Sequence, residues 1–258
     1  MSERQTNYTI GEGMDLPSKG KIYNVPVASH VELRSMTARD EMKRLSPSTA
    51  RFKVLADIIE GCMIEKPAIH VYDMALGDYE YLLHRLRIVT YGSDYKTTSQ
   101  CPHCGYVNNH NINLSELEVT TCDLDNLSDL MEFTLPKSQK RIRISLQTPR
   151  MIDDIVVRNK EMKKKSKGSF TDNTLVLTIV SIISSIDGEY LDAIKKEEFV
   201  RKLPMMDTNY IMKHAQKLVE SFGLNSAVSE ICDLCGLDYT GSFRFSTEFF
   251  GPSIDIWW

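Results

Sequence analysis

The sequence has little that would place the chain in a membrane or a secretion pathway. Its longest apolar run, within TLVLTIVSIISSI, is interrupted by threonine and serine and is too short to cross a bilayer. The first residues, MSERQTNYTIGEG, contain neither the basic segment nor the apolar segment of a signal peptide. We therefore expect no membrane contact, and a reducing compartment in which disulfides are disfavoured.

Signatures of catalysis are also missing from the sequence. There is no phosphate-binding loop, no nucleophile elbow and no H-E-x-x-H motif. His70, His84 and His214 stand apart in the sequence, without a serine or carboxylate arrangement around them. We predict a protein that is not an enzyme and has no small-molecule substrate. The net charge of −4 gives no overall attraction for nucleic acid, which favours protein partners.

What the sequence does have is two cysteine pairs with the same spacing. SQCPHCGYV holds Cys101 and Cys104, EICDLCGLDY holds Cys232 and Cys235, and a glycine follows each pair. A tetrahedral zinc site needs four ligands, and each C-x-x-C loop supplies two thiolates. The glycine allows a left-handed backbone that directs N–H groups at the sulfurs. The sequence thus predicts one structural zinc held by all four cysteines.

The residues around each pair predict a zinc ribbon that is split in sequence. They alternate β-branched or aromatic residues with polar ones, the pattern of two strands joined by a tight loop. The 127 residues 105–231 separate the halves, whereas ordinary ribbons leave roughly 15–20. Closing the longer loop costs only about 2 kcal/mol more. A structural zinc contributes on the order of 10–16 kcal/mol, so the insertion is tolerated.

Other assignments of the cysteines remain open at this point. C-P-H-C also occurs in thiol oxidoreductases, where the first cysteine begins a helix, but here a glycine and a strand-like segment follow. A disulfide, or a mixed site in which His103 or His110 replaces a cysteine, are further alternatives. Cys62 lies on an apolar helical face and is interpreted as a buried small hydrophobe. Cys122 has no assigned role.

Several helix starts are indicated by capping residues. Thr37 followed by Asp40 resembles a capping box that opens a short helix ending before Pro47. Thr148 and Pro149 suit the N-cap and first position of a helix that runs into the basic stretch Lys160 to Lys167. That stretch is interpreted as a solvated helix end. Asp172 is predicted to cap a further helix, whose inward face comprises Leu175, Ile179, Ile182, Ile183 and Ile186.

These elements predict an α+β chain, mainly helical, with a split four-cysteine zinc ribbon, a short β-hairpin and a helical insertion between the two zinc knuckles. The expected division is an extended N-terminal arm over 1–34, a helical region over 35–95, the split ribbon over 96–121 with 226–258, and an inserted hairpin plus helices over 122–225.

The chain resembles the baseplate hub and hub-assembly proteins of T-even-type contractile-tailed bacteriophages. DLPSKGKIY is similar to that family's N-terminal motif, and VELRSMTARDE to its entry into the first helix. DYEYLLHRLRIVTYGSDYKTTSQCPHCG resembles the helix, turn and cysteine pair that follow, while FTLPKSQKRIRISLQTPR and LPMMDTNYI fit later blocks. The resemblance implies a virion protein of the tail baseplate, or a tail assembly factor in the host cytoplasm, with other baseplate or hub proteins as partners.

Two other function classes stay open, and one further surface is expected. A zinc ribbon is also compatible with a nucleic-acid-binding or transcription regulatory protein, and the C-x-x-C pair with a thiol oxidoreductase. Trp257 and Trp258 are the only tryptophans and stand at the end of the sequence. Because tryptophan is enriched in interface hot spots, we expect this pair to bind a partner subunit.

Overall fold

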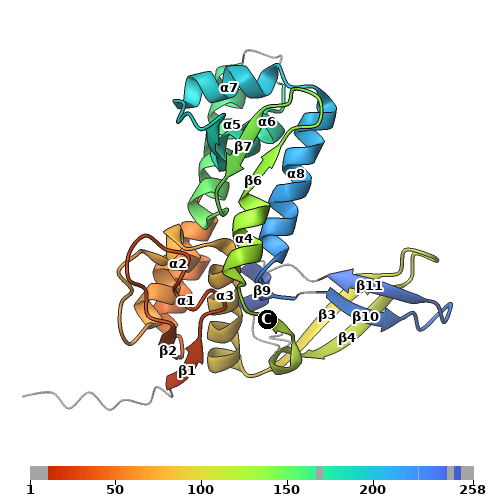
Figure 1. The fold of residues 1–258 in the computed structure, drawn as a ribbon. Coiled ribbons are helices and arrows are strands. Elements are labelled where there is room, and N and C mark those ends of the chain that lie inside the picture. The colour runs from red at the N-terminus through yellow and green to blue at the C-terminus, as the bar shows by residue number, and fades with distance from the viewer. Residues whose placement is uncertain (1–10, 167–170, 226, 243–246, 251–258) are drawn as a thin grey trace, which may run out of the picture.

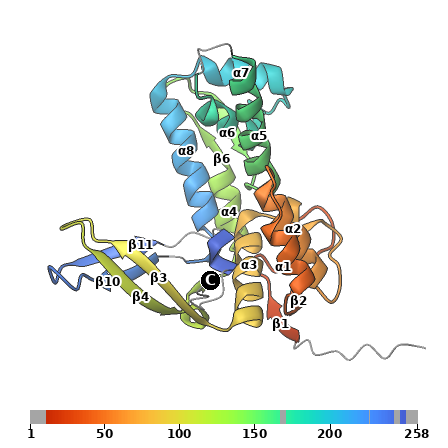
Figure 2. The ribbon, with the colours of Figure 1, turned by 180° about the vertical axis from the view of Figure 1, so that it is seen from behind.

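The computed structural model describes residues 11–166, 171–225, 227–242 and 247–250. Over these residues the chain forms eight α-helices and five small antiparallel sheets, which confirms the α+β class. Figures 1 and 2 show a helical lobe from the first third of the chain, a second lobe extending from it, and two hairpins that project sideways. No helix in these described ranges is long and apolar enough to span a bilayer.

The first lobe packs helices against a two-stranded sheet. Its elements are β1 (Gly11–Asp15), β2 (His30–Arg34), α1 (Ala38–Leu45), α2 (Arg51–Cys62), the 3-10 helix η1 (Val71–Asp73) and α3 (Leu76–Tyr91). The expected extended arm over 1–34 is not what residues 11–34 form, because the chain reverses and β2 pairs antiparallel with β1. The turn residues between the strands allow this reversal, and it buries the apolar side chains of Met14, Leu16 and Leu33 in the core.

The second lobe covers a three-stranded sheet, of order β6-β7-β8, with helices. Its elements are α4 (Leu124–Met131), β6 (Glu132–Thr134), β7 (Arg141–Ile144), α5 (Pro149–Lys165), α6 (Thr174–Ile182), β8 (Ile183–Ile186), α7 (Ala193–Arg201) and α8 (Met205–Glu220). Most of a second hydrophobic cluster lies in this lobe, where Ile142, Ile179 and Ile211 are fully buried, and Ala75 of the first lobe joins it.

Two helix starts form as the sequence predicts. The carboxylate of Asp40 accepts hydrogen bonds from the N–H and the hydroxyl of Thr37, at 3.0 and 2.9 Å, and α1 ends before Pro47. The Thr148 hydroxyl caps α5, whose first residue is Pro149. Both cases depend only on residues within one turn, which is why the sequence sufficed.

The helix predicted after Asp172 is shorter than expected. Asn173 occupies the N-cap position, and α6 ends at Ile182, after which β8 begins. Ile183 and Ile186 therefore face the core from a strand that pairs with β7, and Leu175 is exposed. The segment ISSI satisfies a strand as well as a helix, and pairing with the free edge of β7 decides between them.

Helix α3 is buried on most sides and carries charged groups in the interior. The Asp78 carboxylate accepts hydrogen bonds from the N–H of Ser18 at 3.0 Å and the hydroxyl of Tyr23 at 2.7 Å. The Arg87 guanidinium donates to the backbone carbonyl of Phe249 at 3.0 Å. Since an unpartnered buried charge is strongly unfavourable, these bonds fix the segment after β1 and the chain near residue 249 against α3.

A short strand pair connects the second lobe to the rest of the molecule. β5 (Val119–Thr120) pairs antiparallel with β9 (Gly223–Leu224), and the N–H of Asn225 donates to the carbonyl of Glu118 at 2.9 Å. The two ends of the segment that forms the second lobe therefore lie side by side. We call this strand pair the neck.

The two projecting hairpins come from distant parts of the chain. Their strands are β3 (Asp94–Gln100), β4 (Val107–Asn113), β10 (Ala227–Ile231) and β11 (Asp238–Ser242), with the 3-10 helices η2 (Leu114–Glu116) and η3 (Thr247–Phe250) beside them in sequence. β3 pairs with β4 and β10 with β11, each antiparallel, and the two hairpins run alongside one another in both views (Figures 1 and 2). We call these four strands and their turns the cysteine arm.

Candidate metal centre

The turns of the cysteine arm hold the two cysteine pairs. The β3–β4 pairing ends at Gln100 and Val107, and the β10–β11 pairing ends at Ile231 and Asp238. Each C-x-x-C segment thus fills the tight loop at the end of its hairpin. Because the hairpins run side by side, segments more than a hundred residues apart meet at the end of the arm.

The two loops have the same backbone geometry. The N–H of Cys101 donates to the carbonyl of Tyr106 at 2.8 Å, and the N–H of Gly105 returns to the carbonyl of Cys101 at 2.9 Å. The second loop repeats both bonds from Cys232 and Gly236, at 3.1 and 2.9 Å. The two glycines have φ of +75° and +70°, a left-handed conformation that other residues rarely adopt. The sequence predicts a left-handed backbone at the glycine after each pair, and these two φ values confirm it.

The four sulfur atoms form one compact group. All four Sγ atoms lie within 4.8 Å of one another, with Cys101 to Cys235 at 3.8 Å and Cys104 to Cys232 at 3.6 Å. A disulfide requires about 2.05 Å, so these contacts are not disulfides. Four thiolates at about 2.3 Å from one tetrahedral zinc are about 3.8 Å apart. The residues present therefore fit a single four-coordinate metal ion.

The thiols of this group differ in pKa. Burial opposes ionisation of Cys232, but N–H groups of Cys235 and Leu234 and the neighbouring thiols lower its pKa to about 6. The N–H of Tyr106 favours the thiolate of Cys104, yet desolvation and the other sulfurs raise its pKa to about 12. One thiolate thus makes the next harder to form. A dication removes that repulsion and stabilises all four thiolates together.

A polar network behind the sulfurs joins the two hairpins. The amide of Asn108 donates to the Tyr239 hydroxyl at 3.0 Å and lies 3.8 Å from the Cys232 sulfur, while its oxygen accepts the N–H of Asp233 at 2.9 Å. The Tyr239 hydroxyl is 2.6 Å from the Ser99 hydroxyl. No motif in the sequence indicates this network. Because side chains alternate along a strand, Ser99 and Asn108 lie on one face of the first hairpin, where the second hairpin brings Tyr239 and the N–H of Asp233 to them.

The histidines that could have replaced a cysteine lie outside the sulfur group. The Nε2 atom of His110 is 2.7 Å from the Ser99 hydroxyl, and its Nδ1 is 2.9 Å from the Glu230 carboxylate. His103 contacts the carbonyl of Asp238 at 3.3 Å. The Nε2 atom also lies 3.2 Å from the Tyr239 hydroxyl, so both ring nitrogens of His110 contact the second hairpin. Within the described residues, the metal-ligating group found comprises the four cysteines alone.

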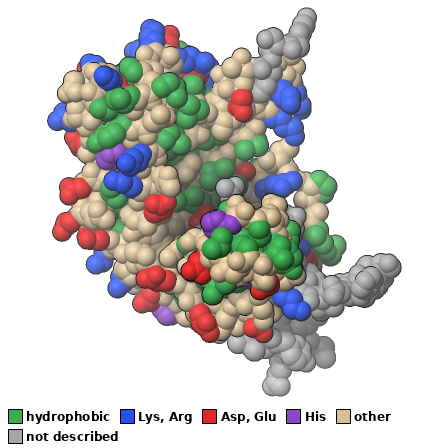
Figure 3. Space-filling view, turned by 90° about the vertical axis from the view of Figure 1, so that its right-hand side faces the viewer, with side chains coloured by type: hydrophobic (Ala, Val, Ile, Leu, Met, Phe, Trp, Pro, Cys, Tyr) green, Lys and Arg blue, Asp and Glu red, His purple; other side chains and the backbone are tan. Residues whose placement is uncertain are grey.

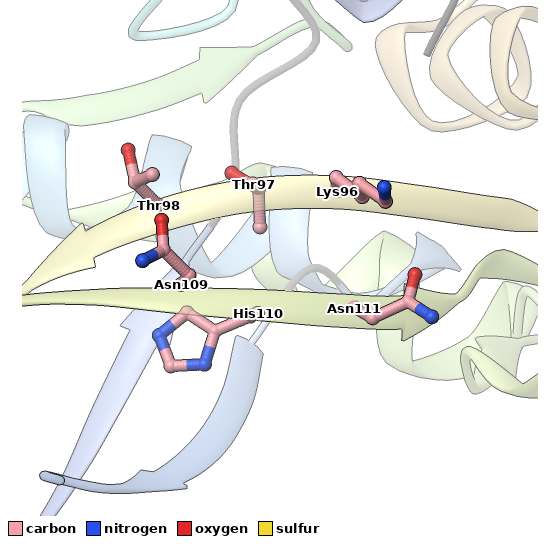
Figure 4. Close-up of a pocket in the computed structure, with 6 residues that line it drawn as sticks. All are labelled: Lys96, Thr97, Thr98, Asn109, His110 and Asn111. Atoms are coloured by element: carbon pink, nitrogen blue, oxygen red, sulfur yellow. The ribbon is translucent and has the colours of Figure 1, made fainter. Parts of the chain in front are cut away.

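A shallow cavity of about 410 Å³ lies along the β3–β4 hairpin, away from the sulfurs. Figure 4 shows its lining from both strands: Lys96, Thr97, Thr98, Asn109, His110 and Asn111. In the same view His110 points toward the second hairpin, in keeping with its bond to Glu230. The remaining groups are hydroxyls, amides and one ammonium. This cavity offers no paired nucleophile and base.

The surroundings of Cys101 also differ from those of a redox-active cysteine. In thiol oxidoreductases the reactive thiol begins a helix, which lowers its pKa. Here Cys101 is 1% exposed, follows β3, and is separated by the turn from β4. The first pair thus lacks the helix that such chemistry uses.

The other residues singled out in the sequence have structural surroundings. Cys62 is fully buried on α2, as predicted, and Cys122 is partly buried. His84 contacts the carbonyl of Leu114 at 2.8 Å, and His214 stacks on Phe133 at 3.9 Å between ring centroids. Trp257 and Trp258 lie outside the described residues.

Fold and site together define an α+β protein whose two distant hairpins are joined at a closed group of four cysteines. The family described as T4 bacteriophage base plate protein matches this chain over residues 12–251. The chain therefore belongs to that phage baseplate family, which confirms the resemblance seen in its sequence motifs. No curated protein and no solved structure matches the chain.

Proposed function

We propose that this protein is a non-enzymatic component or assembly factor of the baseplate hub in a contractile phage tail, stabilised by a structural zinc. The family match over residues 12–251 carries the baseplate assignment. Its place of action is then the tail baseplate of the virion, or the host cytoplasm during assembly. Its partners are other baseplate or hub proteins, without a membrane, nucleic acid or small-molecule substrate.

The zinc ligands in this proposal are Cys101, Cys104, Cys232 and Cys235. Four thiolates with no histidine or carboxylate favour zinc among the common structural ions, and leave no open position for a substrate. When bound, the ion would hold the two hairpins together by their loops. The chain contributes the two turns, the N–H groups that face the sulfurs, and the Asn108 amide beside Cys232.

The predicted division of the chain gains support from the neck. The strand pair β5–β9 sits at the limits of the proposed insertion, 122–225, and brings its two ends together. The hairpins on either side belong to the proposed split ribbon, 96–121 with 226–258. In this proposal the insertion folds around its own core, and zinc joins the two halves of the ribbon beside it.

Metal analysis and substitution test the zinc proposal. Purified protein should contain one zinc per chain, and Cys101→Ser should lower zinc affinity by roughly a hundredfold or more and reduce thermal stability. Cys62→Ala is the matched control, because Cys62 is equally buried but lies on α2, away from the sulfur group. It should keep the metal. A stoichiometric disulfide between knuckle cysteines in protein made under reducing conditions with zinc would contradict the proposal.

Mass spectrometry tests the baseplate role. Comparing purified phage particles with lysate of cells producing the phage separates a virion subunit from a transient assembly factor. Detection of the chain in particles, or baseplates that fail to form in its absence, supports the proposal. Normal baseplates assembled without the chain would overturn it.

The proposed partner-binding role of Trp257 and Trp258 needs its own test. Deleting residues 256–258 should leave the melting temperature of the isolated protein nearly unchanged and weaken its incorporation into the baseplate. Since incorporation and folding are measured separately, the result is unambiguous. A large loss of stability in the isolated chain would show that the tryptophans serve its own fold.

A further inference from the structure

The end of the cysteine arm exposes large apolar side chains beside the sulfurs. Looking toward the arm, Figure 3 shows hydrophobic side chains gathered at its tip. The exposed apolar residues in the two loops and at the adjoining strand ends are between 42% and 66% exposed: Tyr106, Val107, Ile231, Leu234 and Leu237. We call these five residues the tip patch. Clustered exposed apolar surface of this kind is typical of a binding site.

The fold of the loops does not require these side chains. The turn geometry uses the backbone carbonyls of Tyr106 and Leu237, together with cysteine and glycine. Any residue supplies a carbonyl. The side chain of Leu234 is 66% exposed, and only its backbone N–H faces the sulfur group. The apolar character of the tip patch is therefore unexplained by the metal site or by the core.

The charge around the tip patch has one sign. Residues 97–113 and 227–242 contain no lysine or arginine, and their acidic residues are Glu230, Asp233 and Asp238. Glu230 pairs with His110, whereas Asp233 and Asp238 are exposed and form no ion pair among the described residues. Four thiolates on one dication would add a further net charge of −2 in the proposed zinc site.

We propose that the tip patch docks onto a basic, apolar segment of another baseplate protein, one in which lysine or arginine flanks leucine or aromatic side chains. Apolar groups of the segment would cover the tip patch while its cations face Asp233 and Asp238. Nucleic acid would meet the same acidic surface with repulsion, and a second copy of this chain would bring an identical acidic tip. The proposal rests on the baseplate function above and adds the surface and the chemistry of its partner.

Site-specific photocrosslinking tests the docking surface directly. A benzophenone amino acid is placed at Leu234, or at Leu45 as the control, in the full chain within cells that produce the phage. Both leucines are 66% exposed, but Leu45 lies at the end of α1. We expect crosslinks from position 234 into a segment with clustered lysine or arginine beside apolar residues, and at least tenfold fewer from position 45. No crosslink, equal crosslinking from both positions, or crosslinks to nucleic acid, to a second copy or to an acidic segment would overturn the proposal.

Substitutions then separate this proposal from the baseplate role itself. Leu234→Glu, and the pair Asp233→Lys with Asp238→Lys, should each lower recovery of the protein with baseplates at least tenfold. Leu45→Glu should not change it. Zinc content and melting temperature, measured on each variant, must match the parent so that a folding defect is not read as lost docking. Unchanged recovery of all variants would overturn the docking surface while leaving the baseplate function intact.

Discussion

Two helical glycines differ in what a methyl group would meet, and this gives a sharp test of the structure. Gly77 lies one residue inside the start of α3, and Gly61 one residue inside the end of α2. A Cβ on Gly77 would lie 2.7 Å from the carbonyl oxygen of Phe222 and 2.9 Å from its ring. A Cβ on Gly61 would meet nothing within 4 Å. The same substitution therefore has opposite expected effects.

The magnitudes follow from helix propensity and from the clash. Alanine in place of an unobstructed helical glycine stabilises by up to about 1 kcal/mol, so Gly61→Ala should be neutral to stabilising. At Gly77 the same gain is outweighed by overpacking, which typically costs about 1–3 kcal/mol. The backbone oxygen of Phe222 cannot turn aside as a flexible side chain could. We expect Gly77→Ala to destabilise the protein by up to about 2 kcal/mol overall, which is about 1–3 kcal/mol below Gly61→Ala.

Thermal and urea unfolding measure this difference. For a chain of this size 1 kcal/mol corresponds to about 2–4 °C, so Gly77→Ala should melt several degrees below Gly61→Ala. Phe222 precedes the neck, from which the chain continues into β10. Gly77→Ala should therefore also weaken zinc binding, whereas Gly61→Ala should not. Equal stability of the two variants would refute the close packing of α3 against the neck.

Two further predictions concern carboxyl groups on α3. Asp78→Ala should destabilise the fold by about 3–5 kcal/mol in urea unfolding, because it leaves the N–H of Ser18 and the hydroxyl of Tyr23 buried without their acceptor; an effect below about 1 kcal/mol would contradict this. Burial raises the pKa of Glu80 to about 7, above the value of about 4.3 for an unfolded glutamate. The folded state therefore binds this proton more tightly than the unfolded state, and the free energy of unfolding falls as pH rises from about 4 through 7. Glu80→Gln should then stabilise by about 1–2 kcal/mol at pH 8 and hardly at all at pH 4; the same gain at both values would show that titration is not the cause.

The features that the sequence predicted correctly depend on neighbours in the chain. The capping of α1 by Thr37 and Asp40, and the start of α5 at Thr148 and Pro149, involve residues within one turn of each other. The cysteine pairs are an exception, since they are far apart. Their identical spacing and shared chemistry indicated a common site without any knowledge of the path between them.

The features that were missed depend on contacts between distant segments. Ile183 continues the apolar period of α6, yet it begins β8 because the edge of β7 was free to pair. Residues 11–34 contain few strong strand formers, and their pairing depends on the core offered by α2 and α3. Likewise, nothing in the sequence marks Ser99 and Tyr239 as partners, because their contact forms only when the hairpins pack together. Such choices are made by tertiary packing, which overrides weak local preference.

The neck changes the energetic argument about the split site. Taken from sequence alone, joining the cysteine pairs means closing a loop of 127 residues, 105–231. In the structure, pairing of β5 with β9 already brings Thr120 and Gly223 together, so only short connections separate the neck from each hairpin. The hydrophobic cluster centred on the second lobe includes Phe222, next to β9, so its formation favours the neck. A zinc at the four sulfurs would therefore bind hairpins that are largely placed, and more of its binding free energy would stabilise the arm rather than offset loop closure.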